Sequence, residues 1–88
     1  MITVTQGARE ELKRILAEHS DNPDLGLRLT PGTQSDYELL LDGERDGDEV
    51  FQHEGSKVLF VPKDLSNVLD GVTVDFAETD SGRRLVIR

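Results

Sequence analysis

The stretch that most constrains the fold runs from residue 55 to residue 76 and reads GSKVLFVPKDLSNVLDGVTVDF. Residues 57–61 form an almost unbroken apolar run, which is typical of a strand that is buried on both faces. Pro62 ends that strand because its ring removes a ladder donor, and proline suits the first turn of a helix. The sequence therefore predicts a buried strand that leads directly into a helix.

The second half of this stretch predicts the short helix and another strand. Leu65, Val68 and Leu69 recur at the spacing of one apolar face of a two-turn helix. Gly71, after Asp70, is free to take the left-handed conformation that ends many helices. The following strand alternates apolar with more polar positions, and its apolar set is Val72, Val74 and Phe76. The residues that we expect in the buried core are Val58, Phe60, Leu69, Val74 and Phe76.

The rest of the chain supplies one long helix and several short strands. Thr5 is a plausible N-cap, and the apolar spacing after it predicts an amphipathic helix that ends near residues 19–20. Glu10 and Arg14 stand four apart on its outer face and are expected to attract each other. Short alternating or apolar runs predict strands at residues 2–4, 25–29, 37–41, 50–53, 72–78 and 83–88.

The connections between these elements indicate the fold class. Residues 30–35 and 42–49 have loop composition, residues 54–56 have hairpin chemistry, and residues 79–82 suit a hairpin with a bulge. We expect a single α+β domain over residues 1–88, a small and mostly antiparallel β-sandwich or barrel. It has six or seven short strands, one N-terminal amphipathic helix and one short helix.

The charge balance and the cysteine count exclude several classes of function. The chain has 10 Lys and Arg residues against 18 Asp and Glu residues, a net charge of −8, and it has no cysteine. Nucleic acid and anionic membranes need a basic surface, so neither is an expected partner, and this charge favours a monomer or a weak homo-oligomer. Disulfides, thiolate-held metals and cysteine nucleophiles are excluded. The first residues lack the pattern of a secretory signal, so the expected location is cytoplasmic.

Several segments, in order along the chain, resemble the A-type iron–sulphur carrier family with the HesB/IscA-like fold. The match includes the strand and amphipathic helix at the start, GLRL at residues 26–29 and YEL at residues 37–39. It is strongest at GSKV, residues 55–58, and at LDGVTVDF, residues 69–76, which is similar to the LxGxxxDF element of the family. The resemblance implies a HesB-like fold and protein partners among iron–sulphur assembly proteins.

The same resemblance identifies what this chain lacks. Members of the family are described as holding clusters or iron on three cysteines, one between the GLRL-like and YxL-like strands and two in a C-terminal Cys-Gly-Cys. Here the loop at residues 30–35 is shorter and has no cysteine, and the sequence stops at Arg88 without the C-terminal pair. We therefore predict no catalytic, cofactor-binding or metal-binding residues and no enzymatic activity. The expected function is a small protein-interaction or accessory module, linked to cluster assembly.

An acidic run, DGERDGDE at residues 42–49, leaves one alternative open: a carrier of iron or another divalent metal through Asp, Glu and His. Asp42, Glu44 and Asp46, followed by Gly47, partly match a calcium loop, but His53 stands where the pattern requires a glutamate. The competing interpretation is a solvated hairpin loop whose charges keep a sheet edge from aggregating. We favour that interpretation.

The histidines and serines do not form a recognisable site. His19 and His53 have no second histidine at ligand spacing, so we interpret both as surface residues. No serine lies in a Gly-x-Ser-x-Gly elbow, and each occurs in a turn-like or cap-like context. The serines are Ser20, Ser35, Ser56, Ser66 and Ser81.

Three arginines give the last predicted strand a basic character within an acidic chain. We expect Arg83, Arg84 and Arg88 to balance Asp75 and Glu78 on a neighbouring strand, because exposed cross-strand ion pairs are common. The alternative is half of a docking surface or a dimer contact.

Overall fold

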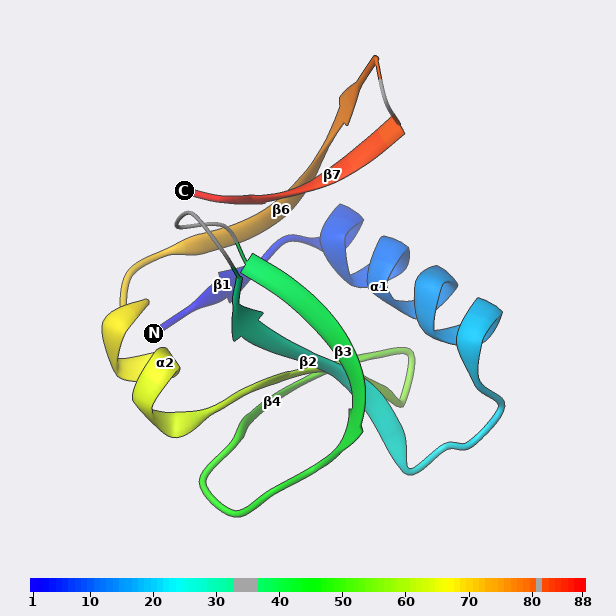
Figure 1. Ribbon diagram of the computed structural model, residues 1–88, viewed down its shortest axis with the longest axis horizontal. Coiled ribbons are helices and arrows are strands. Elements are labelled where there is room, and N and C mark those ends of the chain that lie inside the picture. The colour runs from blue at the N-terminus through cyan, green and yellow to red at the C-terminus, as the bar shows by residue number, and fades with distance from the viewer. Residues whose placement is uncertain (33–36, 81) are drawn as a thin grey trace.

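The computed structural model describes residues 1–32, 37–80 and 82–88, which form two sheets and two helices (Figure 1). The elements are β1 (Thr3–Val4), α1 (Gln6–His19), β2 (Leu25–Pro31), β3 (Tyr37–Gly43), β4 (Glu49–His53), β5 (Ser56–Val61), α2 (Lys63–Val68), β6 (Thr73–Thr79) and β7 (Gly82–Ile87). One sheet has the strand order β1-β6-β7 and the other has the order β3-β2-β5-β4. Helix α1 packs against strands of both sheets and so joins them. Within the described residues, no helix is long and apolar enough to cross a membrane.

The predicted α+β class, strand number and helices are confirmed, whereas the strand pairing is mixed. The described strands pair antiparallel in three hairpins, β2–β3, β4–β5 and β6–β7. Two further pairs, β1–β6 and β2–β5, are parallel. Hairpin turns are visible in the sequence because they are local. The parallel pairs join distant segments, for which the sequence carries no local signal.

Strand β5 is the centre of the hydrophobic core, as the apolar run predicts. Residues 58–61 are fully buried, and Leu12 and Leu16 of α1 pack over this core. Of the predicted core residues, Val58, Phe60, Leu69 and Val74 are buried. Phe76 is only partly buried, because it lies at an open pocket between β6 and α1.

The helix cap and the turns form at the residues that the sequence predicts. The Thr5 hydroxyl accepts a hydrogen bond from the backbone N–H of Ala8, at 3.1 Å, and caps α1. Glu54 and Gly55 have φ values of 51° and 82°, the left-handed pair that a two-residue hairpin between β4 and β5 requires. Gly71 has φ of 85° and ends the turn after α2, as predicted.

Three local predictions need correction. Val68 is 74% exposed, because α2 has just six residues and packs through Leu65 and the following Leu69 instead. Residues 30 and 31 belong to β2, so part of the predicted loop at residues 30–35 is strand. Thr79 pairs directly with Gly82, so the connection between β6 and β7 is shorter than the predicted bulged loop. Ser35 and Ser81 lie outside the described residues.

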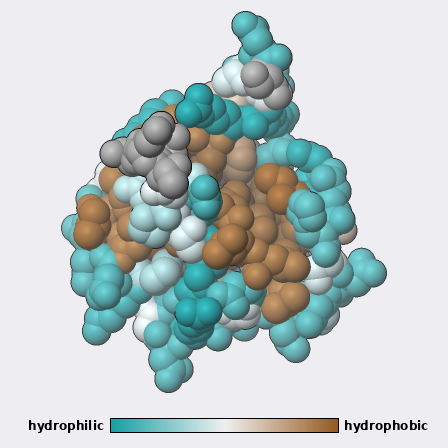
Figure 2. All heavy atoms as spheres, viewed as in Figure 1, coloured by the Kyte–Doolittle hydropathy of each residue, from teal (hydrophilic) through white to brown (hydrophobic). Residues whose placement is uncertain are grey.

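Strand β3 is more exposed than its alternation predicts. The alternation of residues 37–41 places Leu41 on the same face as Tyr37 and Leu39, but Leu41 is exposed, as is Leu40. The reason is that β3 lies at the edge of its sheet and pairs with β2 alone among the described strands. Figure 2 shows apolar residues gathered over the middle of the face that presents β3, surrounded by hydrophilic ones.

Candidate functional site

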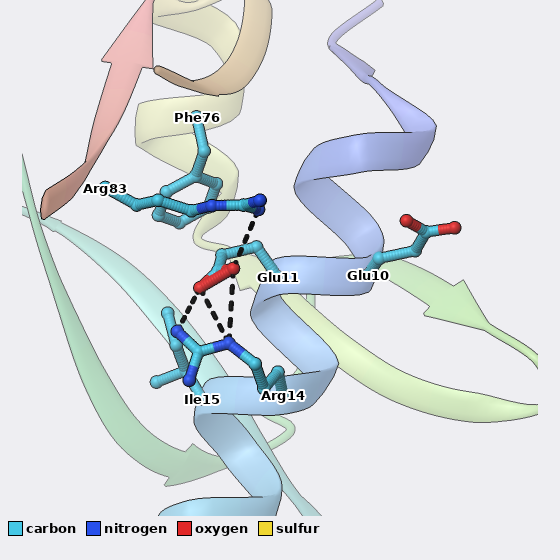
Figure 3. A pocket seen from close by; sticks show the side chains of 6 residues that line it. All are labelled: Glu10, Glu11, Arg14, Ile15, Phe76 and Arg83. Carbon is cyan, nitrogen blue, oxygen red and sulfur yellow. Dashed lines mark hydrogen bonds and ion pairs between the residues drawn. The ribbon is translucent and has the colours of Figure 1, made fainter. Parts of the chain in front are cut away.

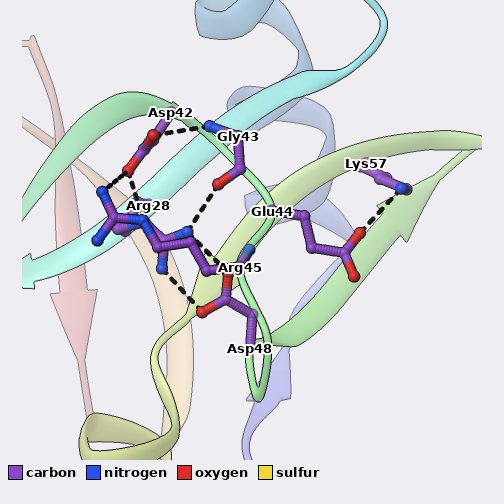
Figure 4. Close-up of polar contacts among 7 residues, drawn as sticks. All are labelled: Arg28, Asp42, Gly43, Glu44, Arg45, Asp48 and Lys57. Atoms are coloured by element: carbon purple, nitrogen blue, oxygen red, sulfur yellow. Dashed lines mark hydrogen bonds and ion pairs between the residues drawn. The ribbon is translucent and has the colours of Figure 1, made fainter.

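The acidic run at residues 42–49 folds around a buried arginine. Arg28 lies on β2 and is 4% exposed. Its Nη1 and Nη2 atoms donate to the two carboxylate oxygens of Asp48, at 2.8 and 2.7 Å (Figure 4). Its Nε donates to Oδ2 of Asp42 at 2.9 Å, and Nη2 also donates to the carbonyl oxygen of Gly43 at 2.8 Å. The guanidinium is therefore bound on three sides.

Burial makes this cluster a strong interaction and not an ordinary surface ion pair. The side chain of Asp48 is 3% exposed, and its hydrogen bonds from Arg28 hold the pKa of this carboxyl below the ordinary value of 3.8. The pKa of Asp42 is also lowered, first by the backbone N–H of Gly43 and then by Arg28. The guanidinium carbon of Arg28 lies 5.7 Å from the ring centroid of Phe60, in the core below.

Arg45 and Glu44 of the run also have partners within the protein. The backbone N–H of Arg45 donates to Asp48 at 2.7 Å, and its side chain pairs with Asp42 at 2.9 Å. Nζ of Lys57 lies 2.9 Å from Oε1 of Glu44. Our preferred interpretation of a solvated loop is therefore wrong for Asp42 and Asp48, since both fold against Arg28.

The metal alternative gains no support from this arrangement. Within residues 1–32, 37–80 and 82–88, no group of three or more His, Cys, Asp or Glu residues is placed to hold a metal ion. His53 lies at the end of β4 that is opposite to the acidic run, and its Nε2 is 3.4 Å from Oε1 of Glu54. His19 is exposed at the last position of α1, so the two imidazoles do not share an element.

A second buried charge, Glu11 on α1, lies between the helix and the C-terminal hairpin. Glu11 is 4% exposed, and Nε of Arg14 donates to its two oxygens at 3.2 and 3.0 Å (Figure 3). Nη1 of Arg83, on β7, donates to Oε1 of Glu11 at 3.0 Å. The Arg14 hydrogen bond is the main reason that the pKa of Glu11 lies below its ordinary value of 4.5.

The predicted Glu10–Arg14 pair on α1 is wrong. Arg14 pairs with Glu11 and Glu18 instead, while Glu10 accepts a long hydrogen bond from Gln6, at 3.5 Å. The prediction considered charges four residues apart, whereas Glu11 stands three residues before Arg14. In the sequence Glu11 does not differ from the other acidic residues of the helix. Glu11 also binds Arg83, which lies 72 residues away in the chain.

Glu11 forms part of an open pocket of about 520 Å³, whose wall also includes Ile15 and Phe76. The side chains of Arg14 and Arg83 are 56% and 50% exposed, so water solvates much of both guanidiniums. All buried side-chain nitrogen and oxygen atoms of the described residues have hydrogen-bond partners. A carboxylate held in its charged form between two arginines fixes α1 against β7, and it is poorly suited to proton transfer near neutral pH.

The basic last strand pairs largely as predicted. Arg88 pairs with Asp75, and Nη2 of Arg83 lies 3.6 Å from Oε1 of Glu78. The Arg83–Glu11 contact is the additional finding, because it joins β7 to helix α1 and not to a neighbouring strand. Of the serines, Ser66 donates to Glu49 at 2.7 Å and Ser20 accepts from the backbone N–H of Asn22 at 3.0 Å, roles that serve the local structure.

Comparisons with known proteins give a consistent result. A family model described as "Iron-sulphur cluster biosynthesis" matches residues 1–87. A protein of Aquifex aeolicus (strain VF5) is 33% identical over 89 residues, which cover 97% of this chain and 76% of that protein.

Two solved structures share the architecture described above. The crystal structure of Escherichia coli SufA, a protein involved in the biosynthesis of iron–sulphur clusters, has a TM-score of 0.76 and 29% identity, covering 99% of this chain and 83% of that one. The crystal structure of IscA with a 2Fe–2S cluster has a TM-score of 0.64 and 21% identity, covering 100% of this chain and 84% of that one, a likeness of fold.

Proposed function

The chain belongs to the iron–sulphur cluster biosynthesis family, and from that premise we propose that it serves cluster assembly as an accessory, protein-binding module. The family match confirms the resemblance that the GLRL and LDGVTVDF segments indicate. The observation that carries the proposal is that the chain keeps the fold over its whole length without a single cysteine. In this account the protein contributes contacts to other proteins and does not hold a cysteine-ligated cluster.

Ligand chemistry supports this proposal. Iron–sulphur clusters are held by cysteine thiolates, and even the centres that use two histidines keep two cysteines. The two histidines of this chain lie at the ends of different elements, α1 and β4. Thr30 and Pro31 end β2, and Gly32 follows them, near the place where the family has its first cysteine. The chain therefore offers no set of soft ligands of its own.

The electrostatics support a role without catalysis. In residues 1–32, 37–80 and 82–88, the groups with shifted pKa values are all stabilised in their charged forms: carboxylates such as Glu11 and Asp48 have lowered values, and Arg28 has a raised one. General acids and bases need the opposite, a pKa brought close to the working pH. We therefore propose that the protein is not an enzyme. From its charge and its first residues we also propose that it acts in the cytoplasm and is a monomer or a weak homo-oligomer.

Crosslinking followed by affinity capture from the lysate of the source organism tests the proposal. The bait carries an N-terminal tag, and an excess of untagged protein serves as the competitor that identifies specific capture by mass spectrometry. We expect enrichment of cysteine desulfurase, scaffold or cluster-accepting proteins, removed by the competitor. Recovery of unrelated proteins alone would show that the fold serves another process.

Calorimetry tests the metal-carrier alternative separately. Anaerobic titration with Fe²⁺, and then with Ca²⁺, is expected to give heats indistinguishable from dilution, because Arg28 and Arg45 already engage Asp42. Tight binding that disappears when Asp42, Glu44 and Asp46 are replaced by Asn, Gln and Asn would establish the alternative instead.

A further inference from the structure

An Asp-Gly peptide is a place where a carboxyl side chain can react with its own backbone. Glycine has no Cβ, so its nitrogen approaches the preceding carboxyl carbon more closely than the nitrogen of a residue with a side chain. The product is a cyclic succinimide, which opens in water to aspartate or to isoaspartate. The chain has three such peptides, Asp42–Gly43, Asp46–Gly47 and Asp70–Gly71, and the structure distinguishes them by the partners of the reacting groups.

Asp46 and Gly47 are the two central residues of an exposed β-turn. The backbone N–H of Asp48 donates to the carbonyl oxygen of Arg45 at 3.1 Å and closes the turn. Gly47 has φ of 85°, the left-handed value that a type II turn requires of its third residue. Within the part of the chain that the structure describes, neither the carboxylate of Asp46 nor the N–H of Gly47 has a hydrogen-bond partner. Both reacting groups are therefore free to approach each other.

The Asp42–Gly43 peptide is held in an unreactive arrangement. Oδ2 of Asp42 accepts hydrogen bonds from Arg28 and Arg45, each at 2.9 Å. Its Oδ1 accepts one from the N–H of Gly43, at 2.8 Å. The Gly43 contact first, and then the arginines, lower the pKa of Asp42 and so deplete the protonated carboxyl from which water leaves. Gly43 also pairs with Leu25 in the sheet, so ring closure would disrupt both the end of β3 and the contacts of a buried arginine.

The Asp70–Gly71 peptide is held less firmly. The N–H of Gly71 donates to the carbonyl oxygen of Met1 at 3.0 Å, so the attacking nitrogen is already engaged. The carboxylate of Asp70 pairs with the amino group of the same residue, at the protein surface. Exposed contacts of this kind contribute little, so we expect protection weaker than that of Asp42.

We propose that Asp46–Gly47 is a site of spontaneous covalent modification, at which the backbone isomerises through a succinimide to isoaspartate. The nitrogen of Gly47 forms a bond to Cγ of Asp46, and the bond between Cγ and the carboxyl OH breaks. The OH leaves as water with the proton of the amide. A second water then adds to the ring: addition at Cγ restores aspartate, and addition at the backbone carbonyl carbon gives isoaspartate. Composition is unchanged overall, and water is the sole co-reactant.

Isomerisation would displace Asp48 from the buried Arg28. In isoaspartate the backbone passes through Cβ and Cγ of residue 46, which adds one backbone atom between Arg45 and Asp48. The N–H of Arg45 donates to Oδ2 of Asp48 at 2.7 Å, and the same carboxylate binds Arg28 at 2.8 and 2.7 Å (Figure 4). The longer turn changes the spacing on which these contacts depend. Modification of the exposed turn therefore weakens the buried cluster.

Ageing of the full chain at neutral pH tests the inference. After weeks of incubation the protein is digested after lysine, and isoaspartate is located by electron-transfer fragmentation of the peptides of residues 14–57 and 64–88. We expect isoaspartate at position 46 to form about tenfold to a hundredfold faster than at position 42, where a charge-assisted hydrogen bond must break first. The expected ratio to position 70 is about threefold to tenfold, for a neutral hydrogen bond. In denaturant the three rates should be similar.

Two variants at the same position provide the controls. Asp46→Glu keeps the charge, but its longer side chain would have to close a larger and less favourable ring, so modification there should stop while positions 42 and 70 are unaffected. Asp46→Asn loses ammonia in place of water in the same ring closure and should form isoaspartate faster. The isoaspartate fraction of this aged variant should melt about 4–8 °C below fresh wild-type protein, the shift expected for one strong hydrogen bond lost in a domain of this size.

Several outcomes would overturn the inference. One is isoaspartate that forms in the folded chain equally at all three positions, or faster at position 42 or 70. Another is a set of ratios identical in the folded and the denatured chain, because the local sequence and not the fold would then decide the site. Absence of isoaspartate after Asp46→Asn has reacted fully would have the same meaning. An unchanged melting temperature of the isoaspartate fraction would contradict the link to Arg28. None of these results bears on the proposed function, which the capture experiment tests independently.

Discussion

The clusters around Arg28 and Glu11 are opposite in charge and differ in the surroundings of their partners. Each centre is 4% exposed and is bound by two residues of the other sign. The main partner of Arg28, Asp48, is as buried as the arginine itself, at 3% exposure. The arginines that bind Glu11 are about half exposed, at 56% and 50%.

This difference decides what each cluster contributes to stability. Removal of Arg28 leaves a buried carboxylate that has lost its counter-charge, and a buried charge without a partner is strongly destabilising. Removal of the Glu11 charge leaves two guanidiniums that water already reaches, so the penalty is mainly the lost hydrogen bonds. The Arg28 cluster therefore contributes more to the free energy of unfolding and holds the acidic run in place. The Glu11 cluster contributes less and holds α1 against β7.

The largest expected effect is that of Arg28→Met. It should lower the free energy of unfolding by about 3–5 kcal/mol, because Asp48 stays buried without its partner. Urea unfolding followed by circular dichroism measures the loss. The double variant Arg28→Met with Asp48→Leu should recover most of it, and a single variant with a loss below about 1 kcal/mol would contradict the proposed role of burial.

The substitution Gly26→Ala, two residues before Arg28 on β2, should have the next largest effect on the free energy of unfolding. A Cβ atom at Gly26 would lie 2.9 Å from Cε2 of Phe60 and 3.3 Å from the carbonyl oxygen of Lys57. Gly26→Ala should therefore cost about 1–3 kcal/mol through overpacking. Gly7→Ala is the matched control, because nothing lies within 4 Å of its added Cβ and alanine favours a helix. Equal melting temperatures for the two variants would show that the packing around Phe60 yields easily.

Glu11→Gln should have a smaller effect than Arg28→Met, about 1–2 kcal/mol, because it removes charge-assisted hydrogen bonds and leaves no buried charge. The same urea experiment measures it. A loss as large as that of Arg28→Met would mean that the exposure of Arg14 and Arg83 does not moderate the interaction.

Arg83→Gln should change global stability by less than about 1 kcal/mol, since Arg14 still binds Glu11 and exposed ion pairs contribute little. Its effect should instead be local. Hydrogen exchange of the β7 amides is expected to become faster relative to the wild-type protein, with the amides of β5 unchanged. Unchanged exchange in β7 would show that the hairpin does not depend on its contact with α1.

The smallest expected effect is that of pH on the free energy of unfolding near neutrality. This effect should become larger at acidic pH. The pKa values of Asp48 and Glu11 are lowered by folding, so their contribution is complete above the ordinary values of 3.8 and 4.5. It is lost as the pH falls through the lower values of the folded state, because protonation then favours the unfolded chain. Unfolding free energies measured from pH 7 to pH 2 should be flat above about 5 and fall below it, less steeply in Asp48→Asn. Maximum stability at acidic pH would contradict this sign.

Local features of the fold follow from the sequence because neighbouring residues determine them. The Thr5 cap, the turn at Glu54 and Gly55 and the left-handed Gly71 after α2 were all predicted and are confirmed. The buried run is confirmed for residues 58–61, whereas the side chain of Lys57 is 41% exposed. Each depends on a backbone preference or a spacing within a few residues. The prediction that Val68 lies on the apolar face is wrong, because the length of α2, and not its apolar spacing, decides which side chains reach the core.

The two charge clusters could not be predicted, because both depend on residues far apart in the chain. Arg28 and Asp48 are separated by 20 residues, and Glu11 and Arg83 by 72. In the sequence Arg28 occupies the polar position of an apparently half-buried strand, and Asp48 is one of several acids in a run. An arginine flanked by leucines on a strand beside the core is the signal that would have suggested a buried pair.

Anaerobic reconstitution tests most directly the central claim, that this family member does not hold a cysteine-type iron–sulphur cluster. The protein is incubated with Fe²⁺ and sulfide, desalted, and examined by visible absorption together with iron and sulfide analysis. IscA, whose crystal structure contains a 2Fe–2S cluster, is the positive control. The account predicts a colourless protein without retained iron. A stable visible chromophore at stoichiometric iron would contradict it and would require ligands other than cysteine.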